Sequence, residues 1–266
     1  MNEAGNLLLE RTGWLYTKLY EGPLFFFDLW SLAHLFSGFF LMLVLRATHQ
    51  RHAFWKLTAM LLGYELLELL FIYVAFHAFR PETLKDQVTD IVVGWTGGLV
   101  ATALFRVSRT LSRPARDALV RHAAALLAAL AIAFEWVGHY GYAYDRPFFN
   151  SRGLCWWAFL LWSLALFGVS EFYATLETRT ASVRKALLLT LIGYVAGLVV
   201  VEHLGYFELG IHEVGHANRT ALAFDLAHGT RGLHVFYTMA PALGVAVFAG
   251  FRALLHRATM PLESAA

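Results

Sequence analysis

The sequence predicts an all-α bundle of transmembrane helices, and three observations lead to this fold class. Apolar residues make up 58% of the 266 residues and charged residues only 15%. The mean hydropathy is +0.54. A soluble domain of average composition carries about 25% charged residues, so this chain lacks the polar surface that water requires. The apolar residues form long runs with no soluble domain between them. We therefore expect a single transmembrane domain over residues 1–266.

Seven runs are long enough to cross a bilayer, since a transmembrane helix needs roughly 20 mostly apolar residues. They are residues 24–46, 54–79, 86–107, 118–140, 154–175, 186–206 and 233–255. Residues 1–23 precede these runs. If they form a helix, Trp14, Leu15 and Leu19 lie near one face and the charged residues lie elsewhere. This pattern is typical of an amphipathic helix in the membrane interface. Gly22-Pro23 would end that helix.

Basic residues predict the orientation, because loops rich in Lys and Arg stay in the cytoplasm. The loops on one side carry 13 of the 21 Lys and Arg residues, and those on the other side carry 8 over longer segments. This asymmetry predicts an N-terminus outside and a C-terminus inside. Most acidic residues lie near the outer ends of the spans, so we expect any chemistry to face away from the cytoplasm.

Composition also excludes several kinds of function. A single cysteine, Cys155, can form neither an internal disulfide framework nor a thiolate cage for a metal. The formal net charge is only +2, and no isolated basic arm exists outside the loops, which argues against nucleic acid as a partner. Serine-nucleophile, phosphate-loop and dinucleotide motifs are missing. The abundant aromatic residues are typical of interfacial belts and lipid-facing surfaces, so membrane lipids are expected partners.

Ionisable side chains inside the spans mark the candidate site. Each costs about 2.5 to 3.5 kcal/mol on insertion scales, so each needs a partner, a cavity or a function. In the second span, Glu65 and Glu68 are three residues apart and share a helix face. At a rise of about 1.5 Å per residue, His34 and Glu68 both lie roughly 15 Å below the outer ends of their helices. We expect that these two side chains can meet.

The third span continues this polar face. Asp86 and Asp90 are one turn apart and are followed at the same spacing by Gly94 and Gly98, which permit close helix packing. Further polar pairs end the fourth and sixth spans: Glu135 with His139, and Glu202 with His203. Two interpretations stay open. The groups form an outward-facing pocket where carboxylates share protons or hold a cation, or they only join helices through hydrogen bonds.

Three segments between residues 28 and 98 carry a resemblance to a known family. They are Asp28 with His34-Leu35-Phe36-Ser37-Gly38-Phe39, then Tyr64-Glu65-Leu66-Leu67-Glu68, then Arg80 with Asp86-Gln87-Val88-Thr89-Asp90 before Gly94 and Gly98. In this order they resemble the VanZ-like superfamily and related bacterial inner-membrane families. The resemblance implies a three-span core at residues 24–107, to which this chain adds four spans at 118–256. It also implies an envelope role, as in glycopeptide antibiotic tolerance. The residues that match the family's recurrent acidic positions are Glu65, Glu68, Asp86 and Asp90.

A second candidate site is the His-rich segment 207–232, which we expect at the outer face. It contains an H-E-x-x-H match, His212-Glu213-Val214-Gly215-His216. On a helix the two histidines would present nitrogens to zinc on one face, with Glu213 as general base. Asp225 and His228 could supply a third ligand. The glycines of the segment place the motif in a loop, so a zinc protease, another metal site and a solvated polar loop all stay open.

The leading hypothesis is an inner-membrane enzyme of the bacterial cell envelope. It would use a divalent metal, zinc before iron or manganese, for hydrolysis or group transfer on a lipid-linked or membrane-embedded substrate. Glu65, Glu68, Asp86 and Asp90 would form the acid/base or cation site, and His34 would hydrogen-bond them. Two alternatives stay open. One is a transporter or antibiotic-tolerance factor whose carboxylates carry protons or bind a cationic ligand. The other is a structural subunit of a membrane complex with partner proteins.

Overall fold

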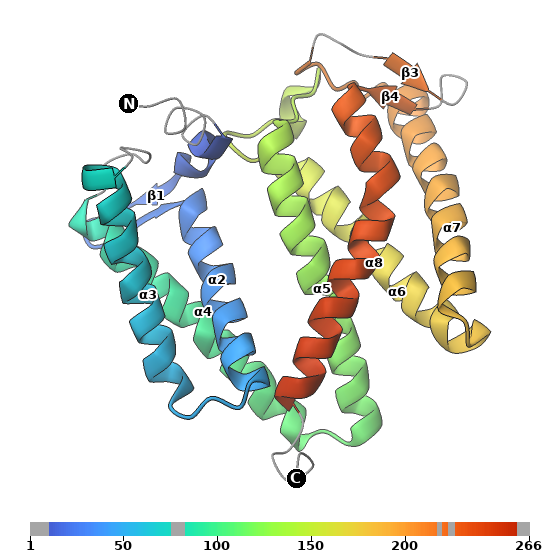
Figure 1. Cartoon of the computed structure of the whole chain (residues 1–266). Coiled ribbons are helices and arrows are strands. Elements are labelled where there is room, and N and C mark those ends of the chain that lie inside the picture. The colour runs from blue at the N-terminus through green and yellow to red at the C-terminus, as the bar shows by residue number, and fades with distance from the viewer. Residues whose placement is uncertain (1–10, 76–82, 217–219, 223–226, 260–266) are drawn as a thin grey trace. The chain divides into compact units, whose positions relative to one another are not determined.

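The computed structural model describes residues 11–75, 83–216, 220–222 and 227–259, most of which are helical (Figure 1). Within these ranges seven helices are long and apolar enough to cross a membrane. They are α2 Leu29–Ala47, α3 Ala53–Leu70, α4 Leu84–Thr110, α5 Arg113–Tyr140, α6 Trp156–Thr180, α7 Val183–His203 and α8 Arg231–Thr259. Turns of π-helix extend α3 through Phe71–Ala75 and α7 through Leu204–Glu208. The predicted all-α fold with seven spans is confirmed.

The short elements form two hairpins and two 3-10 turns. β1 (Lys18–Glu21) pairs antiparallel with β2 (Phe26–Asp28). β3 (Thr220–Leu222) pairs antiparallel with β4 (Ala227–Gly229). The 3-10 turns are η1 (Gly13–Tyr16) and η3 (Pro147–Phe149). In the segment 207–232, the described residues between the π-helical turn and the start of α8 therefore lie outside helices and include a small hairpin.

The prediction of an interfacial helix over residues 1–23 is wrong from Lys18 onwards. Gly22 and Pro23, which we expected to end a helix, form the turn of the β1–β2 hairpin, where Gly22 N–H donates to the Phe25 carbonyl at 2.9 Å. A Gly-Pro pair serves a turn as well as a helix end. Within the described part of this segment, only Arg11 and Thr12 are α-helical, and η1 follows.

The first span also begins later than predicted, at Leu29. The side chain of Asp28 accepts a hydrogen bond from Ser31 N–H at 3.0 Å, which satisfies a free donor at the start of α2. Elsewhere the helices run past the apolar runs into polar residues: α4 continues to Thr110 and α6 to Thr180. Hydropathy detects the apolar stretch that crosses the bilayer, whereas helical hydrogen bonding continues into the basic flanks.

The chain divides into two compact units, which we describe separately. Unit 1 comprises residues 1–117 and 254–266, and unit 2 comprises residues 118–253. In unit 1, α2 packs against both α3 and α4, and the β1–β2 hairpin lies at the N-terminal end of α2 (Figure 1). In unit 2, α6 packs against α7, and the β3–β4 hairpin lies at the C-terminal end of α7 (Figure 1).

The closest helix contact of unit 1 joins α2 and α4 at glycines. A Cβ added to Gly38 would lie 1.9 Å from the carbonyl oxygen of Gly94, and a Cβ on Gly97 would lie 2.1 Å from that of Leu35. The two backbones therefore touch, as small residues allow between membrane helices. The expected packing role of Gly94 is confirmed. Gly98 faces α3, since its Cβ would lie 2.3 Å from Leu57 Cδ2.

Unit 2 has an apolar core between α5, α6 and α8. Its buried members are Ala129, Ile132, Ala133, Leu166, Phe236 and Ala240. The ring of Trp136 stacks on Phe236 with centroids 3.9 Å apart. By contrast, only 6% of the span that contains α7 is buried. That helix therefore presents most of its apolar surface to the surroundings of the chain.

We expect Gly38→Ala to destabilise the chain, because the new methyl group would force α2 away from Gly94. Overpacking of this kind costs about 1 to 3 kcal/mol. Gly63→Ala is the matched control, since a Cβ there meets no atom within 4 Å. It should stabilise α3 by about 0.5 to 1 kcal/mol at most. Thermal unfolding of both purified variants in one detergent is the measurement, and equal unfolding temperatures would contradict the close approach.

Candidate functional site

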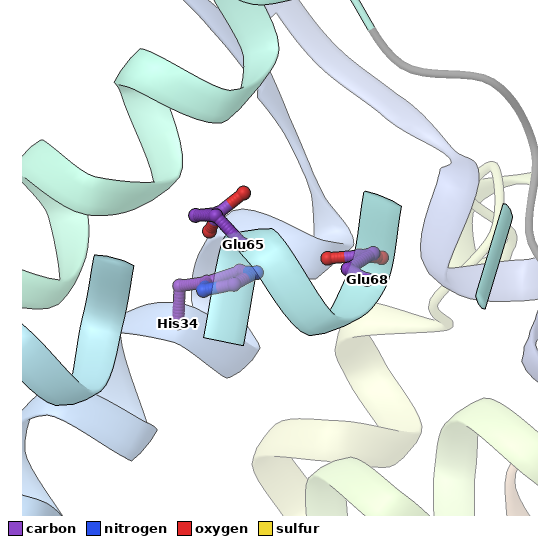
Figure 2. Close-up of side chains that lie close together, drawn as sticks. All are labelled: His34, Glu65 and Glu68. Atoms are coloured by element: carbon purple, nitrogen blue, oxygen red, sulfur yellow. The ribbon is translucent and has the colours of Figure 1, made fainter. Parts of the chain in front are cut away.

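Three buried side chains from α2 and α3 form the candidate site: His34, Glu65 and Glu68. Each residue offers one possible ligand atom, and these three atoms all lie within 4.8 Å of one another. No other group of this kind is found among the described residues. Their exposed fractions are 6%, 7% and 5%. Figure 2 shows the imidazole of His34 beside the turn of α3 that carries both glutamates. The expectation that His34 and Glu68 can meet is confirmed.

Contacts between α2 and α4 hold His34 in place. Its Nε2 lies 3.5 Å from Oδ2 of Asp90, which is 2% exposed. The hydroxyl of Ser31 donates to the other carboxylate oxygen of Asp90 at 3.2 Å. Ser31 also joins Asp28 in the capping box of α2. The residues that begin α2 therefore also fix the carboxylate that faces His34.

The β1–β2 hairpin braces the same end of α4. The backbone N–H of Phe26 donates to Thr89 Oγ1 at 3.2 Å, and Lys85 Nζ lies 3.3 Å from Glu21 Oε1. Hydrogen bonds from Lys18 and Lys85 lower the pKa of the exposed Glu21 below its usual value. Lys85 thus pairs with the hairpin. Arg80, a part of the family resemblance, lies outside the described residues.

The two predicted aspartates differ in position. Asp90 is buried against Ser31 and His34, as described above. Asp86 is half-buried in the first turn of α4, where its backbone N–H donates to Thr83 Oγ1 at 3.3 Å. An acidic residue there interacts favourably with the helix dipole, which gives Asp86 a structural role. Neither aspartate belongs to the group of three that is within ligand distance.

Oε2 of Glu65, one carboxylate oxygen of this cluster, is buried and makes no hydrogen bond to any described residue. Burying a carboxylate costs several kcal/mol unless a proton, a donor or a cation offsets its charge. Since His34 and Glu68 supply further ligand atoms beside Glu65, the arrangement suits a cation.

An apolar cavity of about 260 Å³ reaches the site from between α2 and α3. Its lining is Trp30, Ala33, His34, Ser37, Phe40, Leu41, Met60, Leu61 and Tyr64. The ring of His34 meets that of Tyr64 edge-on, with centroids 5.4 Å apart. The cavity therefore places mostly apolar walls next to the imidazole, a surface that suits hydrocarbon.

The H-E-x-x-H segment is extended rather than helical. Glu213 forms an isolated antiparallel bridge with Tyr144, and Val214 N–H donates to the Ala143 carbonyl at 2.7 Å. Asp145 N–H donates to the His212 carbonyl at 2.9 Å. The two histidines therefore do not share a helix face, and the arrangement that a helical zinc motif requires is absent from this segment.

Each motif histidine has a carboxylate of its own. His212 Nδ1 lies 3.0 Å from Asp145 Oδ2, and His216 Nδ1 lies 3.1 Å from Glu213 Oε1. His228 stacks on Tyr206 with ring centroids 3.9 Å apart. None of these three histidines belongs to a group of three ligand residues within the described chain. Asp225, the other predicted metal ligand, lies outside the described residues.

Some features of the site were missed at the level of sequence. The spacing of Asp28 and Ser31 is that of a helix cap, and it could have indicated that α2 begins at Leu29. The pairing of Lys85 with the β1–β2 hairpin and the ring contact of Tyr64 with His34 were not expected. Each contact joins segments that are far apart in the chain, so no local pattern could reveal it.

These features define a multi-pass helical membrane protein with a buried histidine–carboxylate group in unit 1. Comparisons with protein-family models, curated proteins and solved structures find no match to this chain.

We expect the loop that carries His212 to open as the solution becomes acidic. The backbone N–H and then the side chain of His212 lower the pKa of Asp145 below its usual 3.8. A carboxylate with a depressed pKa stabilises the fold above the unfolded value, and this contribution is lost as the pH falls through the folded value. The exchange of the His212 amide should therefore rise below pH 4 relative to its intrinsic rate.

Hydrogen exchange measured by mass spectrometry tests this loop. At pH 7, Asp145→Ala should speed exchange in the peptide around His212 several-fold, because both hydrogen bonds to the carboxylate are lost. Asp117→Ala serves as control and should leave that peptide unchanged. Exchange in Asp145→Ala at the wild-type rate at pH 7 would show that the contact does not hold the loop.

Proposed function

We propose that this multi-pass membrane protein binds a divalent metal ion at His34, Glu65 and Glu68 and uses it to hydrolyse or transfer a group of a lipid-linked or membrane-embedded substrate. The observation that carries the proposal is the buried, unpartnered Oε2 of Glu65, which belongs to a group within ligand distance. A bound cation offsets the cost of that carboxylate inside a span.

The donor set supports a metal of the zinc, iron or manganese type. One imidazole and two carboxylates are ligands that these ions accept, with zinc favoured as in the sequence-based hypothesis. Three protein ligands leave a coordination position for water, as in catalytic sites. Asp90 beside His34 is the kind of outer carboxylate that fixes the orientation of a ligating ring.

The chemistry follows from a bound water. When bound, a metal of this kind would lower the pKa of a coordinated water toward neutrality and so supply a hydroxide for hydrolysis or group transfer. Glu65, Glu68 and His34 would hold the cation. Asp90, beside His34, would accept the proton that the water loses and return it to the leaving group of the substrate.

The substrate class rests on the neighbouring cavity. Its walls of Trp30, Phe40, Leu41 and Met60 reach His34 and suit a hydrocarbon chain. Residues 28–98, which contain all three proposed ligands, resemble the VanZ-like superfamily. The proposed location in a bacterial inner membrane and the envelope role rest on this resemblance. The outward orientation rests on the distribution of basic residues.

A second candidate function uses the same observation. A proton also neutralises Glu65 or Glu68, so the group would serve a transporter or tolerance factor that carries protons. The two functions differ in whether a metal binds.

We expect the purified full chain to bind about one zinc ion, and Glu65→Gln, Glu68→Gln and His34→Ala each to weaken binding by more than roughly 100-fold, since even outer carboxylates contribute 10- to 100-fold. Glu135→Gln is the control, because that side chain is 69% exposed. Metal content after dialysis against buffered zinc is measured by plasma mass spectrometry. Variants that keep the metal would refute the proposed ligands.

Two further results would redirect the assignment. If His212→Ala and His216→Ala lose the metal while Glu65→Gln keeps it, the ion belongs to the loop. If the wild-type chain binds no metal and Glu65→Gln abolishes a proton-coupled flux in proteoliposomes, the transporter is the better account. Variants that change only stability or assembly would favour a structural subunit.

A further inference from the structure

Unit 2 contains a larger cavity that the His34 site does not use. It lies between α6 and α7 and has a volume of about 530 Å³. Along α7 its lining extends from Thr190 to Glu202, which corresponds to about 18 Å of helix. The apolar members of the lining include Ala158, Leu161, Ala165, Val169, Leu198 and Val201. Its length and its walls match a hydrocarbon chain.

Glycines widen this cavity and leave it open at one side. A Cβ added to Gly168 on α6 or to Gly197 on α7 would meet no atom within 4 Å. Gly193 and Gly197 are exposed, so the cavity is not enclosed by protein. Because the span that contains α7 is only 6% buried, this opening faces lipid when the helix crosses a membrane. A chain can therefore enter from the bilayer.

Polar groups gather at the end of the cavity nearest the β3–β4 hairpin. The hydroxyl of Tyr237 donates to Glu202 Oε1, and the backbone N–H of His228 donates to Glu202 Oε2 at 3.5 Å. Tyr142 is held by the indole N–H groups of Trp136 and Trp162, which donate to its hydroxyl at 3.0 and 2.9 Å. These contacts place a carboxylate and two phenols in fixed positions.

The hydroxyl oxygen of Tyr194, a polar atom of the lining, is buried and makes no hydrogen bond to any residue that the structure describes. A buried hydroxyl without a hydrogen bond destabilises the fold. A polar group of a bound molecule would remove this destabilisation.

A second cavity of about 330 Å³ continues from the polar end. Both cavities are lined by Glu202, Tyr237, Tyr142 and Tyr144, so Glu202 lies where they adjoin. The additional polar lining of the second cavity includes Glu213 and His228, and Nδ1 of His228 is a further buried atom without a hydrogen bond to described residues. Both spaces are mainly apolar, and the second adds Glu213 and His228 to the ionisable groups where they adjoin.

The charge of the lining restricts the ligand. Two carboxylates, Glu202 and Glu213, face the cavities, and no Lys or Arg is among the described lining residues. A phosphate or carboxylate head group would be repelled. A neutral or cationic head group with hydroxyl or amine donors would complement these acceptors.

We propose that the two cavities bind one molecule of a single-chain amphiphile. Its hydrocarbon chain lies between α6 and α7, and its hydroxyl- or amine-bearing head group lies at Glu202 and Tyr237. The site is separate from the His34 group and does not rest on the proposed function.

The first test uses the unmodified full chain in lipid nanodiscs. Three probes share a dodecyl chain with a terminal diazirine and differ in the head group: an amine, a glycerol or a carboxylate. We expect the amine and glycerol probes to label peptides within residues 158–201, and the carboxylate probe to label them roughly tenfold less. Equal labelling by the carboxylate probe, or labelling confined to other peptides, would overturn the proposal.

Variants then test the position of the chain. Gly197→Leu and Gly168→Leu fill the cavity from opposite walls, so each should reduce labelling by the amine probe roughly tenfold. Gly250→Leu on α8 is the matched control, because Gly250 is also exposed with no atom within 4 Å of a Cβ. Unfolding temperatures establish which variants fold. Wild-type labelling in a folded cavity-filling variant would refute the chain position.

Glu202→Gln tests the position of the head group. It removes the negative charge and keeps an acceptor for the Tyr237 hydroxyl. In the wild-type chain the charge of Glu202 should favour the amine probe over the glycerol probe. In the variant we expect labelling by the amine probe to fall to the level of the glycerol probe, which itself stays unchanged. An undiminished preference for the amine would show that Glu202 does not face the head group.

Discussion

The contact between the backbones of α2 and α4 is the constraint on which the His34 site depends. Gly38 and Gly97 allow this contact, since a Cβ on either would lie about 2 Å from a carbonyl oxygen of the other helix. At this separation Ser31 and His34 both reach Asp90. In a bilayer, apolar side chains gain little by leaving lipid for another helix, so packing and polar contacts must supply the association. The same approach that stabilises unit 1 therefore also positions its buried ionisable groups.

The buried acidic side chains of unit 1 differ in how fully their oxygens are hydrogen-bonded. Asp90 receives the Ser31 hydroxyl and faces His34. Asp28 is satisfied by the start of α2. Glu65 keeps one oxygen that no described residue satisfies. If these residues served only to join helices, each carboxylate should find its donor within the bundle, because an unsatisfied buried acceptor is destabilising. The exception at Glu65 is what distinguishes a binding group from a set of structural contacts.

Sequence alone could predict features that follow from local hydropathy and helix geometry. The seven spans follow from hydropathy, and the approach of His34 to Glu68 follows from their equal depth in adjacent helices. The β1–β2 hairpin was missed because Gly22-Pro23 suits both a turn and a helix end. The zinc motif is a different failure. Its spacing has meaning only on a helix, and the segment is instead extended and paired with residues 143–145, more than 60 residues away. No periodicity within the motif reveals such a partner.

Each of the two units has a carboxylate within a span, Glu65 in unit 1 and Glu202 in unit 2, and the surroundings of the two carboxylates indicate different ligands. Glu65 has one oxygen that no described residue hydrogen-bonds, beside a histidine and a second glutamate, and these ligand atoms suit a cation. Both oxygens of Glu202 accept hydrogen bonds, one from Tyr237 and one from His228. Among the described residues, the unsatisfied atoms near Glu202 are instead the hydroxyl of Tyr194 and Nδ1 of His228, in the linings of the two adjoining cavities. Glycines at 168 and 197 provide space there for a chain rather than for an ion. The cost of burying a charge thus locates both sites, and the atoms left without partners indicate what each one binds.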